Sequence, residues 1–214
     1  MPRTSITETE IRETLLKTAR KAFLQNGIHD TEMKNIAESS GLSRSTVYRH
    51  AIDKSQLAFR VVEREIDAMV GDSISFAAQP GSNGHDRLVA FMNRMLDVFE
   101  ERRNDLHLIA EFDTIYKGDY PDIPEARDYV VCMQRYHSIC LLLVLDGLAD
   151  HSLTNIPNAN VFTAMVMNTI FGLALRLYPR EAHYIEEHDS GARPMIDEAI
   201  RVILSAVTPA PDGK

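Results

Sequence analysis

The segment between Ile36 and Arg49 constrains the fold of this chain more than any other stretch. It predicts two short helices joined by a tight turn. Ala37 is small where two helices would cross closely, and Gly41 can adopt the positive φ that a sharp turn after a first helix requires. Ser43 stands where a side chain can cap the second helix by accepting a backbone N–H. The pattern is therefore that of a helical hairpin.

The second helix of this hairpin has one apolar side and one polar side. If Val47 is buried, a rotation of about 100° per residue places Ser45 and Arg49 on the opposite face, with Thr46 and Tyr48 beside them. That face has hydrogen-bonding side chains and a cation but no aliphatic residue, which favours a helix that enters a groove of DNA. The alternative is an ordinary hairpin with a polar outer side. The independent constraints met at positions 37, 41 and 47 weigh against it.

Residues on both sides of the hairpin extend the pattern. The upstream landmarks are Ile11, Leu15, Ala19, Phe23, Gly27 and Thr31, and the downstream ones are His50, Lys54 and Leu57. With this order and spacing, residues 8–60 resemble the amino-terminal DNA-binding domain of the TetR (tetracycline-repressor-like) family of bacterial regulators. One residue departs from the family's pattern, because Ala51 stands where members usually carry an aromatic side chain. The departure affects how the recognition helix packs on the next helix.

The resemblance implies an all-α protein of about nine helices in two domains. Residues 1–53 would form a three-helix, helix-turn-helix DNA-binding domain, and residues 54–214 a larger helical domain that binds an effector and dimerises. Apolar periodicity agrees with this division. It predicts helices at about 7–26, 32–40, 44–50, 54–77, 85–102, 104–117, 124–149, 159–178 and 192–207. Thr7 and Glu10 form a predicted capping box, and residues 79–84 are the clearest loop.

Charge and cysteine usage bear on partners and compartment. The net charge of −8 is uneven, because residues 1–56 hold nine Lys/Arg against seven Asp/Glu and the acidic excess lies in the rest. A near-neutral to basic amino-terminal part on an acidic remainder suits a DNA-binding protein, because the acidic remainder is repelled by the phosphates of DNA. Cys132 and Cys140 are roughly 12 Å apart in one predicted helix, too far for a disulfide within the chain. With no apolar run behind the basic start, we expect a cytoplasmic protein.

The exposed polar face and the resemblance together predict the DNA-binding residues. Ser45 and Arg49 would lie nearest the base edges of a major groove, with Arg49 the candidate for reading guanine. The recognition surface would comprise Arg44, Ser45, Thr46, Tyr48 and Arg49. Phosphates would be held by Thr31, Lys34, Ser43, Tyr48, His50 and Lys54.

One recognition helix reads only a few base pairs, so we expect a homodimer on a double-stranded DNA operator with two-fold symmetry. The two most apolar late helices would form the contact as a four-helix bundle with their symmetry mates, which the resemblance also implies. One would contribute Val161, Met165, Asn168, Thr169, Gly172 and Leu175, and the other Ile196, Ile200, Ile203 and Val207. Core packing inside one subunit is the alternative. The stretch 161–178 also approaches membrane-spanning length, but its polar residues favour a buried interface helix.

In the family, the middle helices enclose a small-molecule cavity, and we expect one here. Its candidate lining is Met69, Met92, Met95, Phe99, Phe112, Asp113, Tyr116, Met133, Tyr136, His137 and Phe171. The absence of a basic cluster among these residues favours a neutral or cationic, largely hydrophobic effector. Asp113 would be the counter-charge of a cationic one, or else a helix-surface residue.

No pattern of residues favours an enzyme, a cofactor or a metal. The stretch 183–188 approaches the His-x-x-Glu-His spacing of metalloproteases but has one residue too many, so a solvated acidic loop is expected. Asp113 and His137 are a weak metal-site alternative that no spacing demands. The leading hypothesis is a repressor released from its operator by a small effector. The alternative is a DNA-binding protein of the same fold that is controlled by a protein partner or has no small effector.

Overall fold

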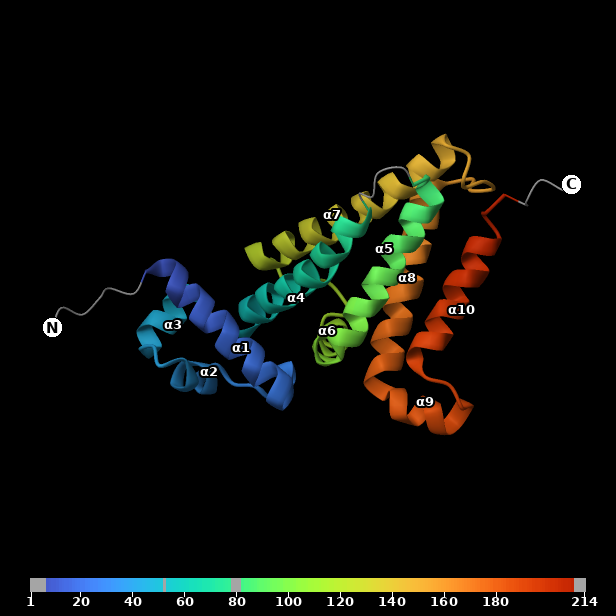
Figure 1. Cartoon of the computed structure of the whole chain (residues 1–214). Helices are drawn as coiled ribbons and strands as arrows, with labels where there is room; N and C mark the ends of the chain where they lie inside the picture. Colours follow the sequence, from blue (N-terminus) through green and yellow to red (C-terminus); the bar gives the residue numbers. More distant parts are fainter. Residues whose placement is uncertain (1–6, 52, 78–81, 210–214) are drawn as a thin grey trace, which may run out of the picture. The chain divides into compact units, whose positions relative to one another are not determined.

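The computed structural model describes residues 7–51, 53–77 and 82–209. These residues form helices and connecting loops, with no strand among them, so the predicted all-α class is confirmed (Figure 1). The helices are α1 (Glu8–Asp30), α2 (Met33–Ser40), α3 (Arg44–His50), α4 (Lys54–Ala77), α5 (Gly84–Glu101), α6 (Arg103–Ile115), α7 (Pro124–Ala149), α8 (Ala159–Leu177), the 3₁₀ turn η1 (Tyr178–Arg180), α9 (Glu181–His188) and α10 (Ala192–Ser205). Part of the predicted loop at 79–84 lies outside the described residues.

The segment between α8 and α10 differs from the expectation. Residues 183–188 belong to helix α9 and not to a solvated loop. The reason is an aromatic anchor: Tyr184 is buried, and the ring of His188, one turn later, stacks on it with centroids 5.9 Å apart. The guanidinium groups of Arg176 and Arg180 lie 5.9 and 5.7 Å from the Tyr184 ring. Burial of one side chain outweighs the polarity of the others.

The chain divides into two compact units. Unit 1 comprises Met1–Ile66 and His107–Val131, and unit 2 comprises Asp67–Leu106 and Cys132–Lys214. The division differs from the predicted boundary at residue 53, because the first half of α4, most of α6 and the start of α7 join the three amino-terminal helices.

Unit 1 contains the predicted hairpin. The apolar stripe of α1 is buried, as its spacing predicted, and the capping box of Thr7 and Glu10 is formed. Gly27 breaks the helix with φ of 82°, and one further turn follows it. The carboxylate of Glu111 on α6 accepts hydrogen bonds from the backbone N–H groups of Ile28 and His29 at 2.8 and 3.0 Å. The end of α1 is thereby fixed to α6.

Aromatic side chains form the rest of the core of unit 1. Phe59 of α4 is fully buried and packs against Phe112 with ring centroids 4.8 Å apart. The other rings of this cluster are Tyr116, Tyr120 and Tyr129. Edge-to-face pairs of this kind favour a fixed geometry of α4, α6 and α7.

In unit 2, α5 begins where its backbone closely approaches that of α7. Glycines meet at this point, Gly84 of α5 and Gly147 of α7. The first N–H groups of α5 are satisfied by side chains, since Gly84 donates to Asp150 at 2.6 Å and His85 to Ser152 at 2.9 Å. Hydrogen bonds from Ser152 and from the Gly84 N–H hold the pKa of Asp150 below its usual value.

Two stretches pass a length and composition test for a membrane span, Pro124–Ala149 and Ala159–His188. The apolar pattern of the sequence indicates only the second. Core helices of soluble proteins pass the same test. In unit 2, α8 packs against α10, and the buried residues of α8 include Val166 and Ile170.

Candidate DNA-binding site

The turn and the recognition helix have the geometry that the sequence predicted. Gly41 ends α2 in the left-handed conformation with φ of 69°. The Ser43 hydroxyl accepts a hydrogen bond from the Thr46 N–H at 3.2 Å and so caps α3. Val47 is fully buried, together with Ile36 and Ala37 of α2. These contacts fix which side of α3 faces the protein.

The opposite side of α3 is open to solvent. Ser45, Tyr48 and Arg49 are exposed, and Thr46 is half-buried. The Ser43 hydroxyl is also 2.9 Å from that of Ser45, so the start of the helix forms a small hydroxyl cluster. Arg44 is exposed but paired, since its guanidinium donates to Glu38 of α2 at 3.0 Å. The face therefore presents one cation, Arg49, for which no partner is found among the described residues.

The residues predicted to hold phosphates do not form a uniform set. Lys34 is exposed on α2 and has no partner among the described residues. The Lys54 ammonium donates to the His29 carbonyl at 2.6 Å, and the buried Nε2 atom of His50 has no partner in the described part of the chain. The prediction that Thr31 holds a phosphate is corrected, because this residue is 2% exposed and its hydroxyl donates to the Gly27 carbonyl at 2.6 Å. It closes the end of α1, so its hydroxyl is not free for a phosphate.

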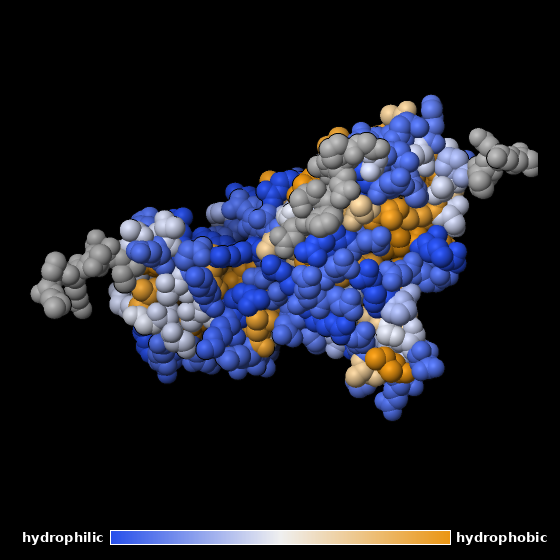
Figure 2. All heavy atoms as spheres, in the orientation of Figure 1, coloured by the Kyte–Doolittle hydropathy of each residue, from blue (hydrophilic) through white to orange (hydrophobic). Residues whose placement is uncertain are grey.

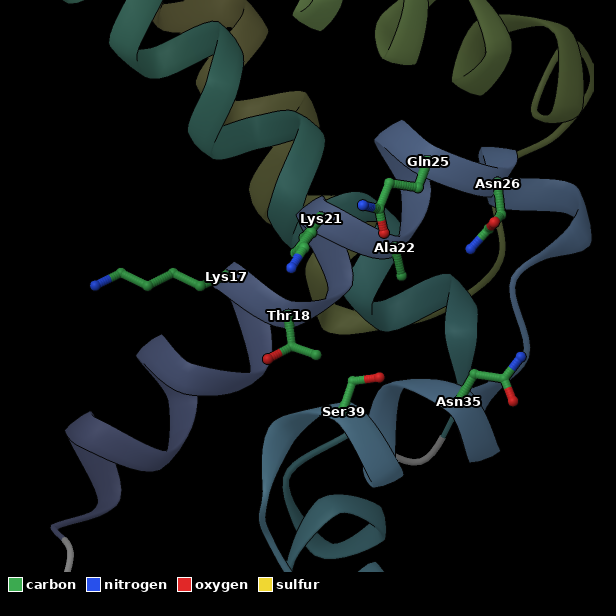
Figure 3. Close-up of a pocket in the computed structure, with 8 residues that line it drawn as sticks. All are labelled: Lys17, Thr18, Lys21, Ala22, Gln25, Asn26, Asn35 and Ser39. Atoms are coloured by element: carbon green, nitrogen blue, oxygen red, sulfur yellow. The ribbon is translucent and has the colours of Figure 1, made fainter.

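A polar groove of about 320 Å³ lies between α1 and α2 (Figure 3). Its lining is Lys17, Thr18, Lys21, Ala22, Gln25, Asn26, Asn35 and Ser39. Thr18 of α1 faces Ser39 of α2, while Lys17 extends away from the groove. Thr18, Ala22 and Ser39 contribute small side chains to the lining, and Gln25, Asn26 and Asn35 contribute amides.

The comparison with known protein families agrees with this geometry. The model of bacterial regulatory proteins of the tetR family matches residues 15–61, which include α2, α3 and the turn between them. Over these residues, the predicted resemblance to the TetR family is confirmed. One relative is the HTH-type transcriptional activator FasR of Mycolicibacterium smegmatis, 29% identical over 106 residues. The match covers 50% of this chain and 48% of FasR, so the chain spans about half the length of that relative.

Solved structures extend the TetR-family likeness to the whole fold. A regulator of the TetR/AcrR family from Thermobifida fusca has a TM-score of 0.65 at 21% identity, over 90% of this chain and 96% of that one. The repressor FadR of Thermus thermophilus, solved in complex with lauroyl-CoA, has a TM-score of 0.64 at 17% identity, over 94% and 100%. At these identities the likeness is one of fold.

The residues predicted for dimerisation differ in how far they are buried within one subunit. On α8, Val161, Met165, Asn168 and Gly172 are exposed, and Thr169 and Leu175 are half-buried. The prediction that Ile196, Ile200 and Val207 contact a second subunit is corrected, because these side chains are buried within unit 2. Ile203 is half-buried. The neighbouring apolar positions, one residue earlier in each case, are more open: Val202 and the C-cap residue Ala206 are exposed, and Met195 and Ala199 are half-buried. Figure 2 shows hydrophobic surface on unit 2 between α5 and α10.

The candidate effector residues are divided between the two units. Unit 2 holds Met69, Met92, Met95, Phe99, Met133, Tyr136, His137 and Phe171, and unit 1 holds Phe112, Asp113 and Tyr116. Phe112 and Tyr116 belong to the aromatic cluster, and Asp113 is exposed, as its helix-surface alternative stated. His137 is hydrogen-bonded through Nε2 to Asn160 at 2.8 Å. Among the described residues, no group of three His, Cys, Asp or Glu side chains is placed to hold a metal.

The sequence did not predict the side chains that connect helices α1 and α3 to α4, α6 and α7. Glu111 and Glu125 come from α6 and α7, and Arg60 comes from α4. In the sequence, Glu125 after Pro124 is an ordinary acidic residue in the first turn of a helix. No local pattern distinguishes a carboxylate that pairs with a residue 65 positions away.

Proposed function

We propose that this protein is a DNA-binding transcriptional regulator that acts as a homodimer on a two-fold symmetric operator. The observation that carries the proposal is the exposed polar face of α3, backed by a buried Val47 and a capped N-terminus. The match of residues 15–61 to the TetR family and the similarity to FasR support it. Ser45 and Arg49 would contact base edges, with Arg44, Thr46 and Tyr48 around them. Ser43, Lys34, His50 and Lys54 would lie toward the phosphates.

Replacing Arg49 by alanine is expected to weaken binding to the preferred duplex by about 1–3 kcal/mol and to relax the preference at one base position. Lys34→Ala is the matched control, because Lys34 is an exposed cation on α2 without a partner among the described residues. It should weaken all duplexes alike and reduce the salt dependence. Lys54 is less suitable, since its ammonium also holds the His29 carbonyl. Gel-shift titration with selected and scrambled duplexes measures both effects. Unchanged sequence preference in Arg49→Ala would refute this assignment of faces.

The homodimer would form through the exposed faces of α8 and α10. Apolar area is left uncovered in one subunit on α8 and near the end of α10, where Val202 and Ala206 are exposed and Met195 and Ala199 half-buried. Two copies related by a two-fold axis would bury these faces in a four-helix bundle. Such a pairing would place two recognition helices at a fixed separation, as operator half-sites require.

A small, largely hydrophobic effector would release the operator. Buried methionines and aromatic rings such as Met69, Met92 and Phe99 favour an apolar ligand. FadR of Thermus thermophilus, of the same fold, is a repressor solved with lauroyl-CoA, whereas FasR is an activator. We propose that the protein is a repressor that its effector releases from the operator. Release follows if the effector binds better to a dimer whose two DNA-binding domains have another separation.

Thermal stabilisation by candidate effectors tests the sensor. Fatty acids, hydrophobic amines and neutral aromatics should be compared at one protein concentration. A compound at 100 times its dissociation constant stabilises the folded protein by about 2.7 kcal/mol, which is a readily measured shift. The same compound should weaken DNA binding. Stabilisation without any effect on DNA binding would contradict the regulatory role.

A further inference from the structure

A buried carboxylate of α7 is linked to the carboxyl-terminal end of the recognition helix. Glu125, in the first turn of α7, is 3% exposed. Its carboxylate is paired with the guanidinium of Arg60 and accepts a hydrogen bond from the Gln56 amide at 3.2 Å. The other terminal nitrogen of Arg60, Nη1, donates to the carbonyl of His50 at 3.2 Å. His50 is the last residue of α3, so three side chains and one carbonyl form a continuous chain.

The recognition helix needs this support at its end. It has only seven residues, and the last carbonyls of a helix have no partner within it. The Ala51 N–H still bonds to the Val47 carbonyl at 2.9 Å. Among the described residues, Arg60 is the side chain that donates to a carbonyl of α3. Ala51 itself is buried but too small to wedge the helix in place, in a position where TetR-family members usually carry an aromatic ring.

The buried carboxylate fixes the orientation of Arg60. An unpaired carboxylate at this depth would be strongly unfavourable, so Glu125 holds the guanidinium and the Gln56 amide against itself. Guanidinium groups present several N–H donors in a rigid plane. When one edge of that plane is held by Glu125, the direction of the remaining Nη1 donor is set.

We propose that Glu125, acting through Arg60, is a positioning residue that sets the angle of α3 for reading DNA. The inference rests on the proposed function. Neither side chain contacts DNA in this arrangement; they act through the His50 carbonyl. Loss of the link should leave phosphate contacts in place and reduce discrimination between sequences. The preference for a selected duplex over a scrambled one should fall about tenfold, the equivalent of one well-placed hydrogen bond, with the salt slope unchanged.

The experiment separates positioning from stability with a double variant. Arg60→Met alone strands a buried carboxylate and should destabilise the fold, whereas Arg60→Met with Glu125→Met removes both charges and should recover the melting temperature. The double variant still lacks the donor to the His50 carbonyl. Arg60→Lys is a second variant, which keeps a charge for Glu125 but lacks the planar fork that reaches both partners. The probes are a duplex enriched from random-sequence DNA by the wild-type protein and a scrambled duplex of equal length.

A matched control comes from the next turn of α4. Arg64 pairs with Glu13 of α1 at 2.8 Å, with both side chains more than two-fifths exposed. Arg64→Met with Glu13→Met should leave the preference unchanged, because an exposed pair contributes little. In the protein without DNA, hydrogen exchange at the Ala51 amide should be about tenfold faster in the double variant of Arg60 and Glu125 and unchanged in the control.

Each outcome bears on the proposal. A lower preference and faster exchange at a recovered melting temperature would support it. Wild-type preference in both the double variant and Arg60→Lys would overturn it, as would an equal loss on both duplexes. If the wild-type protein enriched no duplex, the proposed function would fall, and the exchange measurement would still decide whether Arg60 holds the end of α3.

Discussion

Replacement of Gly84 by alanine is expected to destabilise unit 2 by about 3 kcal/mol, the upper part of the usual range for overpacking. An alanine Cβ there would lie 2.7 Å from the carbonyl carbon of Asp146, and closer still to the backbone nitrogen and Cα of Gly147. All three atoms belong to the backbone of α7, which cannot rotate away as a side chain can. The two helices must therefore separate, and the hydrogen bond from Gly84 to Asp150 would lengthen.

Thermal unfolding at a fixed protein concentration measures this effect. A loss of this size corresponds to roughly 6–12 °C for a chain of this length. Gly71→Ala is the control, because Gly71 is exposed in α4 and an added Cβ would have no neighbour within 4 Å. That variant should be more stable by about 0.5–1 kcal/mol, since alanine favours the helix. Equal melting temperatures for Gly84→Ala and the wild type would refute the close approach of α5 and α7.

Met165→Glu is expected to convert the proposed dimer into monomers and to weaken operator binding by about 10²–10⁴-fold. Met165 is 43% exposed on the open face of α8, where a dimer contact would bury it. A buried and unpaired carboxylate opposes association. Because the two heads bind two half-sites as one unit, loss of the dimer removes the advantage of the second head.

Light scattering and DNA titration on the same samples test this prediction. Leu142→Glu is the control, since Leu142 is also an exposed apolar residue of unit 2 but lies on α7. It should leave both the mass and the affinity unchanged. A Met165→Glu protein that remained dimeric at micromolar concentration would place the subunit contact elsewhere.

Features that depend on neighbours in the chain could be predicted from the sequence. The turn at Gly41 and the cap at Ser43 need only the residues around them, because a positive φ and a side-chain acceptor are local properties. Val47 and its polar neighbours follow from the helical repeat. The same repeat predicted nearly all the helices and the buried stripe of α1.

Periodicity identifies an apolar face but not what covers it. On α10, the apolar repeat predicts that Ile196 and Ile200 contact a second subunit, whereas the structure buries them within their own. The side around Val202 has the same spacing but mostly smaller apolar residues, so periodicity does not distinguish the two sides. Helix α9 was missed for a related reason, since a single buried Tyr184 outweighs a polar composition only where another part of unit 2 receives it.

The sequence by itself determined the helices, the hairpin and the outward face of α3, because each depends on residues a few positions apart. Only the tertiary structure decided which carboxylates hold the DNA-binding head. Glu111 binds backbone groups 83 and 82 residues earlier in the chain, and Glu125 binds a side chain 65 residues earlier. No periodicity relates positions so far apart. Their role arises from burial: a carboxylate removed from water must find donors, and the fold brings the end of α1 and Arg60 within reach.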